Sequence, residues 1–299
     1  MSSGSKAGSI GTPRTELEID AALVKALLAG QHPDLAQLPI QRMEAGWDNA
    51  MFRLGNNLSV RLPCRKAAAD LIKNEQTWLP LLADQLTLPI PTPYRIGQAA
   101  HGYPWQWSVL PWLKGVAADQ QEPDENQANP LAKFLRSLHT AAPPNAPVNE
   151  FRGFLPHRAA AVEERMKRLE SKTNLITPAI KHLWNQALNA PDDVPAKWLH
   201  GDLHARNVLV ENGALTGIID WGDITSGDIA TDLASIWMLF SKPEARQQAL
   251  TEYNMSEATL QRARGWAIFF GVMLLDTGLI DNHRHAVMGE RTLQRVLVF

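Results

Sequence analysis

Cysteine is almost absent from this sequence: Cys64 is the only one among 299 residues. A single cysteine excludes a disulfide within the chain and a zinc site built from several thiolates. The formal net charge of −2 gives no electrostatic reason to expect nucleic acid or an anionic membrane surface as a partner. No apolar run reaches the length of a membrane span, and the opening MSSGSKAGSIGTPRTE lacks the hydrophobic segment of a secretory signal. We therefore expect a cytoplasmic protein without a membrane or nucleic-acid partner.

The composition is that of a globular protein, with 45% apolar and 20% charged residues, but the pattern changes along the chain. Residues 1–15 have the character of a flexible tail. Residues 16–112 contain strand-like runs and helical spacing at 16–29 and 67–86, whereas residues 113–299 are mostly helical. The helices expected there are 130–142, 157–171, 178–189, 229–240, 243–253, 256–276 and 285–297. We predict an α+β fold with a small strand-rich N-terminal lobe and a larger, mostly helical C-terminal lobe.

The stretch HGDLHARN, residues 200–207, concentrates polar chemistry. Its eight residues include two histidines, an aspartate, an arginine and an asparagine. A catalytic loop, a metal site and an ordinary polar turn would each explain such a cluster, so its composition alone does not decide between them.

The residues that follow this stretch predict a β-hairpin. VLV and LTGII are short strand-like runs, and Asn212-Gly213 between them is a favoured two-residue hairpin turn. A hairpin would return Asp220 to the level of Asn207, beside Asp202. Carboxylate and amide oxygens are the ligands that suit Mg²⁺ rather than zinc. The sequence therefore predicts a magnesium site formed by Asn207 and Asp220 next to Asp202.

The same residues match a known template. The protein-kinase catalytic loop has the pattern H-R-D-L-x-x-x-N and is followed by D-F-G. HGDLHARN and Asp220-Trp221-Gly222 fall in register with that pattern, and GDIATDLA follows. The chain in this region resembles the aminoglycoside phosphotransferase-like kinases, which are relatives of choline kinase and of the eukaryotic protein kinases. Gly201 and His204 favour this small-molecule branch over the H-R-D protein kinases.

This resemblance implies a bilobal protein-kinase-like fold with a nucleotide between the lobes. Residues 16–112 would form the nucleotide-binding lobe, and residues 113–299 the catalytic and substrate-binding lobe. Asp202 would orient the acceptor hydroxyl and accept its proton, while Asn207 and Asp220 would hold Mg²⁺. The implied reaction transfers the γ-phosphate of ATP or GTP to a hydroxyl of an aminoglycoside-like or macrolide-like antibiotic, or of a metabolite.

Further features of the N-terminal part occur in the order the resemblance implies. Gly46 and Asn49 would lie at the tip of the hairpin that covers the phosphates. Arg61 stands where the family usually has the nucleotide lysine, and Glu75 follows where its acidic partner is expected; Lys66 or Lys73 could instead supply the cation. WSVLPWLKG resembles the hinge whose backbone holds the adenine, which makes Leu110 and Trp112 candidate nucleotide contacts.

Two functions from other classes are alternatives. A metal-dependent hydrolase could use His200 and His204, which lie four residues apart, but it would not explain why the hairpin returns Asp220. A non-catalytic pseudokinase-like binding protein is the second, and the intact Asp202, Asn207 and Asp220 argue against it. His204 could contact substrate or brace the loop, and we expect His200 to hold the loop through its ring nitrogens. Arg206 could bind the transferring phosphate or pair with an acid.

The sequence indicates the chemical class of the acceptor less clearly than the reaction. Residues 200–232 contain six carboxylates against one arginine, which would suit a cationic acceptor but is also typical of solvated loops. Beyond residue 240, the candidate lining residues are Trp266, Phe270, Asp276 and Asp281, although helical spacing alone favours a core or surface position for each. These motifs do not distinguish ATP from GTP, and they do not define an oligomeric state.

Overall fold

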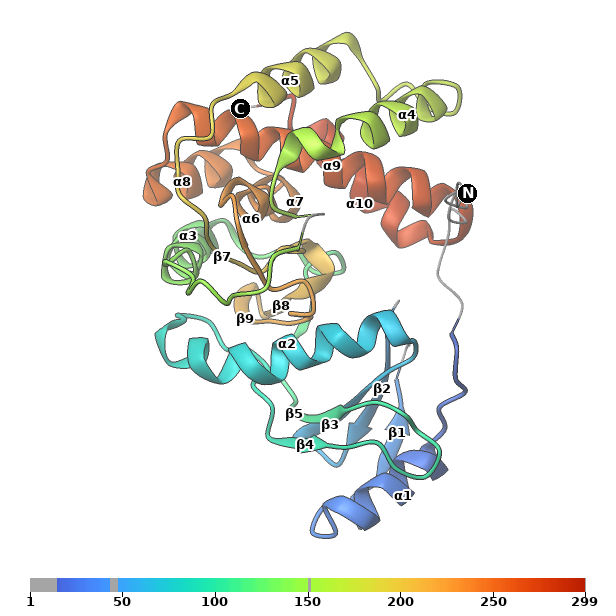
Figure 1. The fold of residues 1–299 in the computed structure, drawn as a ribbon. Coiled ribbons are helices and arrows are strands. Elements are labelled where there is room, and N and C mark those ends of the chain that lie inside the picture. The colour runs from blue at the N-terminus through green and yellow to red at the C-terminus, as the bar shows by residue number, and fades with distance from the viewer. Residues whose placement is uncertain (1–14, 44–47, 150–151, 299) are drawn as a thin grey trace.

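The computed structural model describes residues 15–43, 48–149 and 152–298, and within them a five-stranded sheet lies below a larger helical region (Figure 1). The sheet comes from the N-terminal part of the chain, and most of the helices come from the C-terminal part. The predicted α+β fold, strand-rich first and mostly helical afterwards, is confirmed.

The N-terminal sheet is antiparallel and has the strand order β1-β2-β3-β5-β4. Apolar side chains on its buried face, including Phe52, Val60 and Val109, pack with helix α1, which begins after the N-cap Asp20. The bounds are α1 (Ala21–Gln31), β1 (Ile40–Arg42), β2 (Asn49–Leu54), β3 (Leu58–Pro63), β4 (Arg95–Gly97) and β5 (Trp107–Pro111). The predicted helix at 16–29 is therefore shorter at its start, because Asp20 accepts from Leu23 N and fixes the first turn.

Helix α2 (Lys66–Leu82) lies between the sheet and the helical region, and a 3₁₀ turn at Ala83–Gln85 follows it (Figure 1). It packs near β3 and β5, whereas its Leu79 and Leu82 belong to the core of the helical region. Glu75 is only 2% exposed, because it lies in the middle of this boundary helix. An ionisable side chain is thereby fixed where the two parts meet.

The helical region contains the expected helices, with bounds close to the predicted ones. They are α3 (Ala128–Leu138), α4 (Ala159–Glu170), α5 (Pro178–Asn189), α6 (Ala230–Leu233), α7 (Ser235–Leu239), α8 (Pro243–Tyr253), α9 (Glu257–Asp281) and α10 (His283–Arg295). The helix predicted at 229–240 is two short helices, and the one predicted at 256–276 extends to Asp281. Short 3₁₀ turns occur at Glu125–Gln127, Leu155–Arg158 and Ala205–Asn207.

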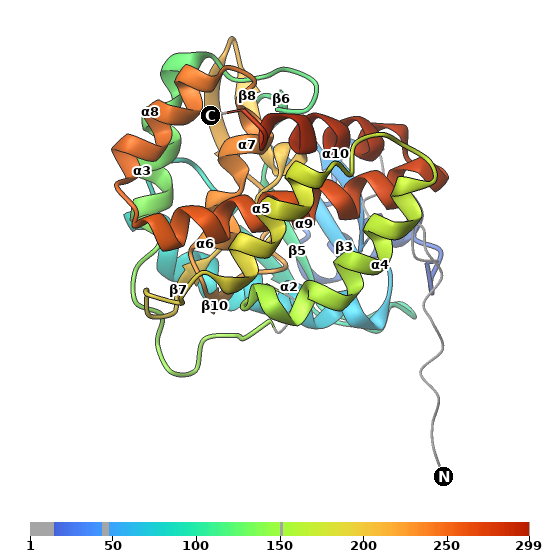
Figure 2. The same ribbon diagram turned by 90° about the horizontal axis from the view of Figure 1, so that it is seen from above.

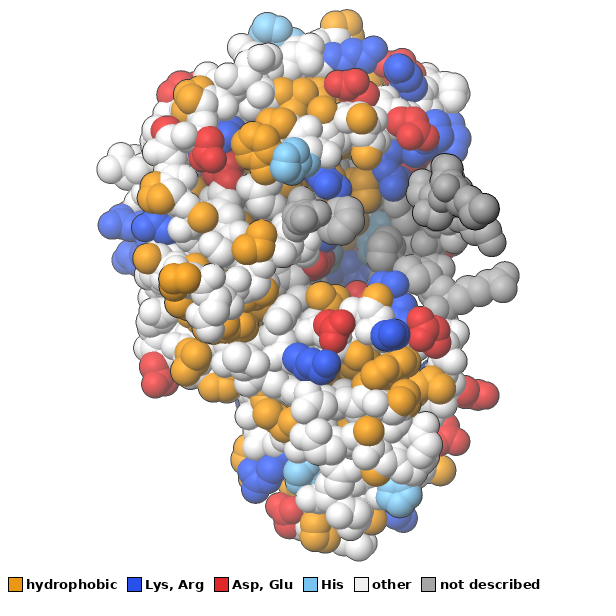
Figure 3. Space-filling model, viewed as in Figure 1, with side chains coloured by type: hydrophobic (Ala, Val, Ile, Leu, Met, Phe, Trp, Pro, Cys, Tyr) orange, Lys and Arg blue, Asp and Glu red, His pale blue; other side chains and the backbone are white. Residues whose placement is uncertain are grey.

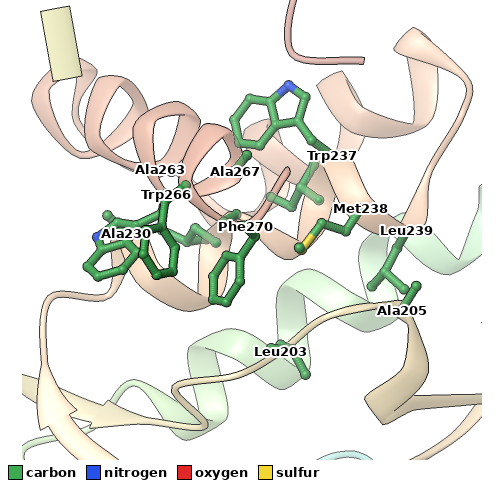
Figure 4. Close-up of a cluster of buried hydrophobic side chains, with 14 of the residues drawn as sticks. Leu203, Ala205, Ala230, Trp237, Met238, Leu239, Ala263, Trp266, Ala267 and Phe270 are labelled. Carbon is green, nitrogen blue, oxygen red and sulfur yellow. The ribbon is translucent and has the colours of Figure 1, made fainter. Parts of the chain in front are cut away.

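Helix α9 is the centre of this region, and α4, α5, α6 and α10 pack around it (Figure 2). Trp266 and Phe270 of α9 share a buried cluster with Leu203 and Ala205 of the HGDLHARN loop (Figure 4). By length and composition α9 could span a membrane, so the expectation that no apolar segment reaches that length is wrong. Because 78% of its apolar window is buried in the fold, it has the burial of a core helix.

Two small sheets complete the helical region. β7 (Lys197–Leu199) pairs with β10 (Thr225–Gly227), and β6 (Val116–Ala117) pairs with the hairpin of β8 (Val208–Glu211) and β9 (Ala214–Ile218). At the hairpin tip Asn212 and Gly213 have φ angles of 52° and 81°. Two consecutive left-handed residues are what a type I′ turn requires, so the predicted hairpin is confirmed together with its turn residues.

Candidate active site

The HGDLHARN loop, residues 200–207, is held in place by one buried carboxylate. Asp232 accepts from His200 N at 2.7 Å and from Gly201 N at 2.9 Å. His139 Nε2 lies 3.4 Å from the same carboxylate, and its Nδ1 contacts the Tyr253 hydroxyl at 2.7 Å. Because both oxygens of Asp232 bind backbone N–H groups, this side chain fixes where the loop begins.

Gly201 allows the loop to turn sharply. Its φ is 83°, and a Cβ at this position would lie 2.5 Å from the backbone oxygen of Asp223. No side chain fits so close to a backbone atom, and the left-handed conformation is itself costly for other residues. Glycine is therefore required here to bring Asp202 close to the chain segment around Asp223.

His200 has a structural role in this loop. Its Nδ1 accepts from Asp202 N at 3.2 Å, and its Nε2 donates to Ile219 O at 3.0 Å. The ring lies 4.6 Å from the Trp221 ring, and Trp221 donates its own N–H to Ile218 O. Both ring nitrogens of His200 are thus committed to backbone, as the expected bracing role requires, and neither is available to a metal. No cluster of three His, Cys, Asp or Glu side chains that could hold a metal occurs among the described residues. These observations argue against the hydrolase alternative.

Asn207 and Asp220 lie at the same end of the hairpin, as the sequence predicts. Ile219 N donates to Asn207 O at 2.9 Å, so the residues on either side of β8 and β9 are adjacent. Asn207 Nδ2 donates to Asp202 O at 2.8 Å, which leaves the amide oxygen as the atom that could bind a cation. Asp220 has a φ of 62°, and its carboxylate is 54% exposed. An amide oxygen and an exposed carboxylate next to Asp202 fit the ligand chemistry of Mg²⁺.

Asp202 is kept in its ionised form. Its Oδ1 accepts from Arg152 Nη2 at 2.9 Å, and its Oδ2 lies 3.5 Å from His204 Nε2. Burial raises the pKa of the carboxyl, but Arg152 and then the nearby histidines outweigh burial and lower the pKa below its ordinary value. At neutral pH the side chain is therefore a carboxylate that can only accept protons or hydrogen bonds.

Arg152 and Asp223 were not predicted by sequence reasoning. Arg152 bridges Asp202 and Asp223, with Nη2 3.4 Å from Asp223 Oδ2, and its guanidinium lies 5.4 Å from the Phe270 ring centroid. Burial, with the charges of Asp202 and Asp220, raises the pKa of Asp223, although Arg152 opposes the rise. Arg152 precedes Asp202 by fifty residues, in a stretch without a motif, so no local pattern could have identified the contact.

Arg61 joins the two parts of the molecule. From β3 its Nη1 contacts Glu75 Oε1 and its Nη2 contacts Asp220 Oδ1, both at 2.6 Å. The Asn49 amide oxygen, turned toward the guanidinium, accepts from Nε at 3.1 Å and from Nη2 at 2.8 Å. Burial would lower the pKa of Arg61, but Glu75 and Asp220 hold it above its ordinary value. Lys73, the alternative cation, instead pairs with exposed Asp70 on α2.

These side chains line a cleft of about 620 Å³ between the two parts. Figure 3 shows the surface hollowed at this level. Leu110 and Trp112 form one wall, and Arg53 stacks 3.8 Å from the centroid of the Trp112 ring. Asn49, Arg61, Asp202, Asn207 and Asp220 also line the cleft, whereas Glu75 lies behind Arg61. Gly46 lies outside the described residues. The structure therefore brings the other predicted site residues to one cleft or directly behind it.

His204 and Arg206 continue the wall toward α10. His204 caps the 3₁₀ turn by accepting from Arg206 N, and burial lowers the pKa of its ring. Arg206 Nη1 lies 2.8 Å from His285 Nε2. Since a guanidinium only donates hydrogen bonds, this imidazole nitrogen is an acceptor and His285 is neutral. Arg206 therefore contacts a neutral histidine and not an acid. No sequence motif indicated this contact.

We expect His285 to contribute to acid sensitivity. Burial, with Arg206 and His204 nearby, lowers the pKa of His285 from 6.5 to about 4. As the pH falls between these values, the unfolded chain binds a proton that the folded chain does not, so stability is lost. His285→Gln keeps an oxygen that can accept from Arg206, and between about pH 7.5 and about pH 5 it should lose about 2 kcal/mol less stability than wild type. Urea unfolding measures the difference, and equal losses would contradict a neutral buried His285.

The four candidate lining residues on α9 differ in whether they reach the cleft. Phe270 lines the cleft, together with Phe269, Met273 and Leu274. Trp266 is fully buried in the core, and Asp276 is 1% exposed and paired with Arg165 and Arg168. Asp281, at the exposed end of α9, is not part of the cleft wall. Only one of the four predicted residues therefore lies at this site.

The chain is similar to known phosphotransferases. Residues 39–266 match the model of a family described as the phosphotransferase enzyme family. An aminoglycoside 3'-phosphotransferase of Escherichia coli is 27% identical over 172 residues, covering 52% of this chain and 61% of the relative, which is less than two thirds of its length.

Solved structures are similar over nearly the whole chain. Aminoglycoside 2'-phosphotransferase-IIIa in complex with GDP superposes with a TM-score of 0.68 at 18% identity, covering 93% of this chain and 99% of that one. Spectinomycin phosphotransferase with ADP and spectinomycin superposes with a TM-score of 0.66 at 18% identity, covering 94% and 98%. At this identity the likeness establishes the fold.

Proposed function

Because the chain belongs to the phosphotransferase enzyme family, which residues 39–266 match, we propose that it is a kinase that transfers the γ-phosphate of ATP or GTP to a hydroxyl of a small molecule. The observation that carries the proposal is the convergence of Asp202, Asn207 and Asp220 in one cleft. The acceptor would be an aminoglycoside-like or other antibiotic, or a metabolite, since similar proteins are named for antibiotic substrates. The nucleotide pool on which it would act is cytoplasmic, which is where we propose that it works.

Several residues of the cleft have a role in this reaction. Asp202, ionised at neutral pH, accepts a hydrogen bond from the acceptor hydroxyl and then its proton, so that the oxygen points along the line of attack. Arg61, fixed by Glu75, presents its guanidinium to phosphate oxygens, and it has to release its contacts with Asn49 or Asp220 to bind a phosphate through two N–H groups. Leu110 and Trp112 would enclose the base of the nucleotide. Arg152 has to yield part of its contact with Asp202 when the hydroxyl arrives.

Asn207 and Asp220 are the residues that would hold Mg²⁺. Bound there, the ion would neutralise charge on the nucleotide phosphates. The amide nitrogen of Asn207 is tied to Asp202 O, so its oxygen is oriented without any ligand. Asp220 shares one oxygen with Arg61, and its exposed carboxylate has a second oxygen for a cation. The position of both ligands is thus set by the chain itself.

Thermal shift tests this assignment directly. With Mg²⁺ present, ATP or GTP at about 100 times its Kd should stabilise the wild-type protein by about 2.7 kcal/mol, and EDTA should remove most of that effect. Asp220→Asn should weaken Mg²⁺-dependent nucleotide binding by at least about tenfold, because a neutral amide replaces a charged ligand. Asp70→Asn, the same change at a side chain that is 79% exposed on α2, is the matched control. If both variants bind Mg²⁺-nucleotide like wild type, the magnesium assignment is wrong.

A further inference from the structure

The carboxylates around the HGDLHARN loop are already paired within the protein. The sequence of residues 200–232 shows six acids against one arginine, but partners from other segments compensate them. Apart from exposed Glu211, each is bound by arginine or by backbone N–H: Asp202 and Asp223 by Arg152, Asp220 by Arg61, Asp228 by Arg262, and Asp232 by His200 and Gly201. Asp202 and Asp223 share Arg152, and Asp220 and Glu75 share Arg61, so arginines from other segments reduce the local excess of negative charge.

Arg206 has no acidic partner among the residues that the structure describes. Its guanidinium lies on the cleft wall and contacts the neutral ring of His285. Within residues 15–43, 48–149 and 152–298, no carboxylate lies within ion-pair distance of Arg206. A half-buried arginine without a counter-ion attracts an anion more strongly than an exposed one, because the wall around it is partly desolvated.

Helix α9 contributes a mostly apolar part of the cleft wall. We call the part of the cleft between the loop, Arg152, α9 and α10 the acceptor side. From α9 it is lined by Phe269, Phe270 and Met273, and the described residues of α9 and α10 contribute no acidic side chain to it. Asp276, the acid nearest these residues along α9, points into an ion pair with Arg165 and Arg168 inside the fold. The acceptor side thus combines aromatic surface from α9 with Arg206 and with the Arg152 that Asp202 and Asp223 share.

We propose that the acceptor is a hydroxyl compound with an apolar or aromatic body and an anionic group, a carboxylate or phosphate ester, that pairs with Arg206. This inference rests on the phosphotransfer proposed above and narrows its acceptor class. The body would lie against Phe269, Phe270 and Met273 while the hydroxyl reaches Asp202. A polycation that fills the same space would bring an amine toward Arg206, with which no described carboxylate pairs, and such a like-charge contact opposes binding.

A matched set of three compounds isolates the charge. Phenyllactate, its amide and 1-amino-3-phenylpropan-2-ol share the phenyl ring and the hydroxyl, and differ in carrying an anion, a neutral amide or a cation. We expect phenyllactate to bind the protein with ADP and Mg²⁺ at least about tenfold more tightly than the amino alcohol, with the amide between them. Titration calorimetry measures the three Kd values, and kanamycin is added as a polycationic probe that should bind more weakly than phenyllactate.

Variants of Arg206 assign the preference to this side chain. Arg206→Gln should reduce the preference to less than about threefold, whereas Arg206→Lys should retain most of it. Arg291→Gln, the same charge change at an exposed position of α10, should leave it unchanged. Equal Kd values for the three compounds, tighter binding of the amino alcohol or of kanamycin, or a preference that survives Arg206→Gln would each overturn the inference.

The same samples separate this inference from the proposed function. The charge preference is measured with and without ADP and Mg²⁺, and ADP binding is measured on its own. A preference for the anion in a protein that does not bind nucleotide contradicts the phosphotransfer proposal and leaves the Arg206 site standing. Nucleotide binding with the opposite charge preference contradicts the acceptor inference alone.

Discussion

Asp202→Asn should reduce turnover by about 10²–10⁴-fold while Mg²⁺-dependent nucleotide binding stays within about threefold of wild type. The substitution keeps the shape of the side chain and its contact with Arg152 through the amide oxygen, but it removes the group that accepts the hydroxyl proton. The loss should fall on kcat rather than on the KM for nucleotide, since Asp202 faces the acceptor and the nucleotide is held by other residues. Release of ADP or GDP in the presence of hydroxyl acceptors measures it.

Asp223 provides the decisive comparison for this prediction. It shares Arg152 with Asp202 and also lines the cleft, so geometry alone offers two candidate proton acceptors. Their positions differ, because Asn207 donates to the backbone oxygen of Asp202 and so keeps Asp202 beside the proposed magnesium ligand, whereas burial raises the pKa of Asp223 and favours its neutral form. Asp223→Asn should therefore cost less than about tenfold in kcat. If Asp223→Asn were the more damaging change, the roles of the two carboxylates would be reversed.

The part of the site that could be predicted from sequence is the part that is local. Asn207 and Asp220 are thirteen residues apart and joined by a hairpin whose turn residues, Asn212 and Gly213, specify the fold-back, while an irregularity between Leu209 and Val210 shifts the register by one residue. A two-residue turn leaves little freedom in which residues pair. The positions of Arg61 and Glu75 were expected only through resemblance, because a strand and a helix fourteen residues apart can meet in many ways.

The charge balance of the site could not be read from the sequence. Its compensating cations come from distant segments: Arg152 lies before α4, Arg61 on β3 and Arg262 on α9. Counting charges within residues 200–232 therefore gave an acidic site, whereas the folded cleft pairs nearly all of those acids. Tertiary packing determines which charged side chains pair with one another, and no periodic pattern in the sequence indicates these pairs.

Arg61→Met should destabilise the protein by about 3–5 kcal/mol, because it leaves Glu75 as a buried acid without its cation. Burial already raises the pKa of Glu75 to about 7, and Arg61 opposes that rise. In the Arg61→Met variant the pKa of Glu75 in the folded protein should rise further above its ordinary value of 4.5. An acid with a raised folded pKa binds its proton more tightly when folded, so the deficit relative to wild type should be largest above neutral pH and should shrink as the pH falls toward about 7, below which Glu75 is protonated in both folded proteins.

A double substitution separates loss of the ion pair from loss of packing. Arg61→Met combined with Glu75→Leu removes both charges, so it should recover most of the stability and its pH dependence. Arg65→Met is the control for a partly exposed pair, since Arg65 and Asp48 are both about a quarter exposed, and it should cost less than about 1 kcal/mol. Urea unfolding at two pH values measures all three variants. If the double variant is as unstable as Arg61→Met, the loss of stability arises from lost packing between the lobes. The charge of Glu75 would then not contribute to it, and the position of Glu75 would be set by the helix to which it belongs.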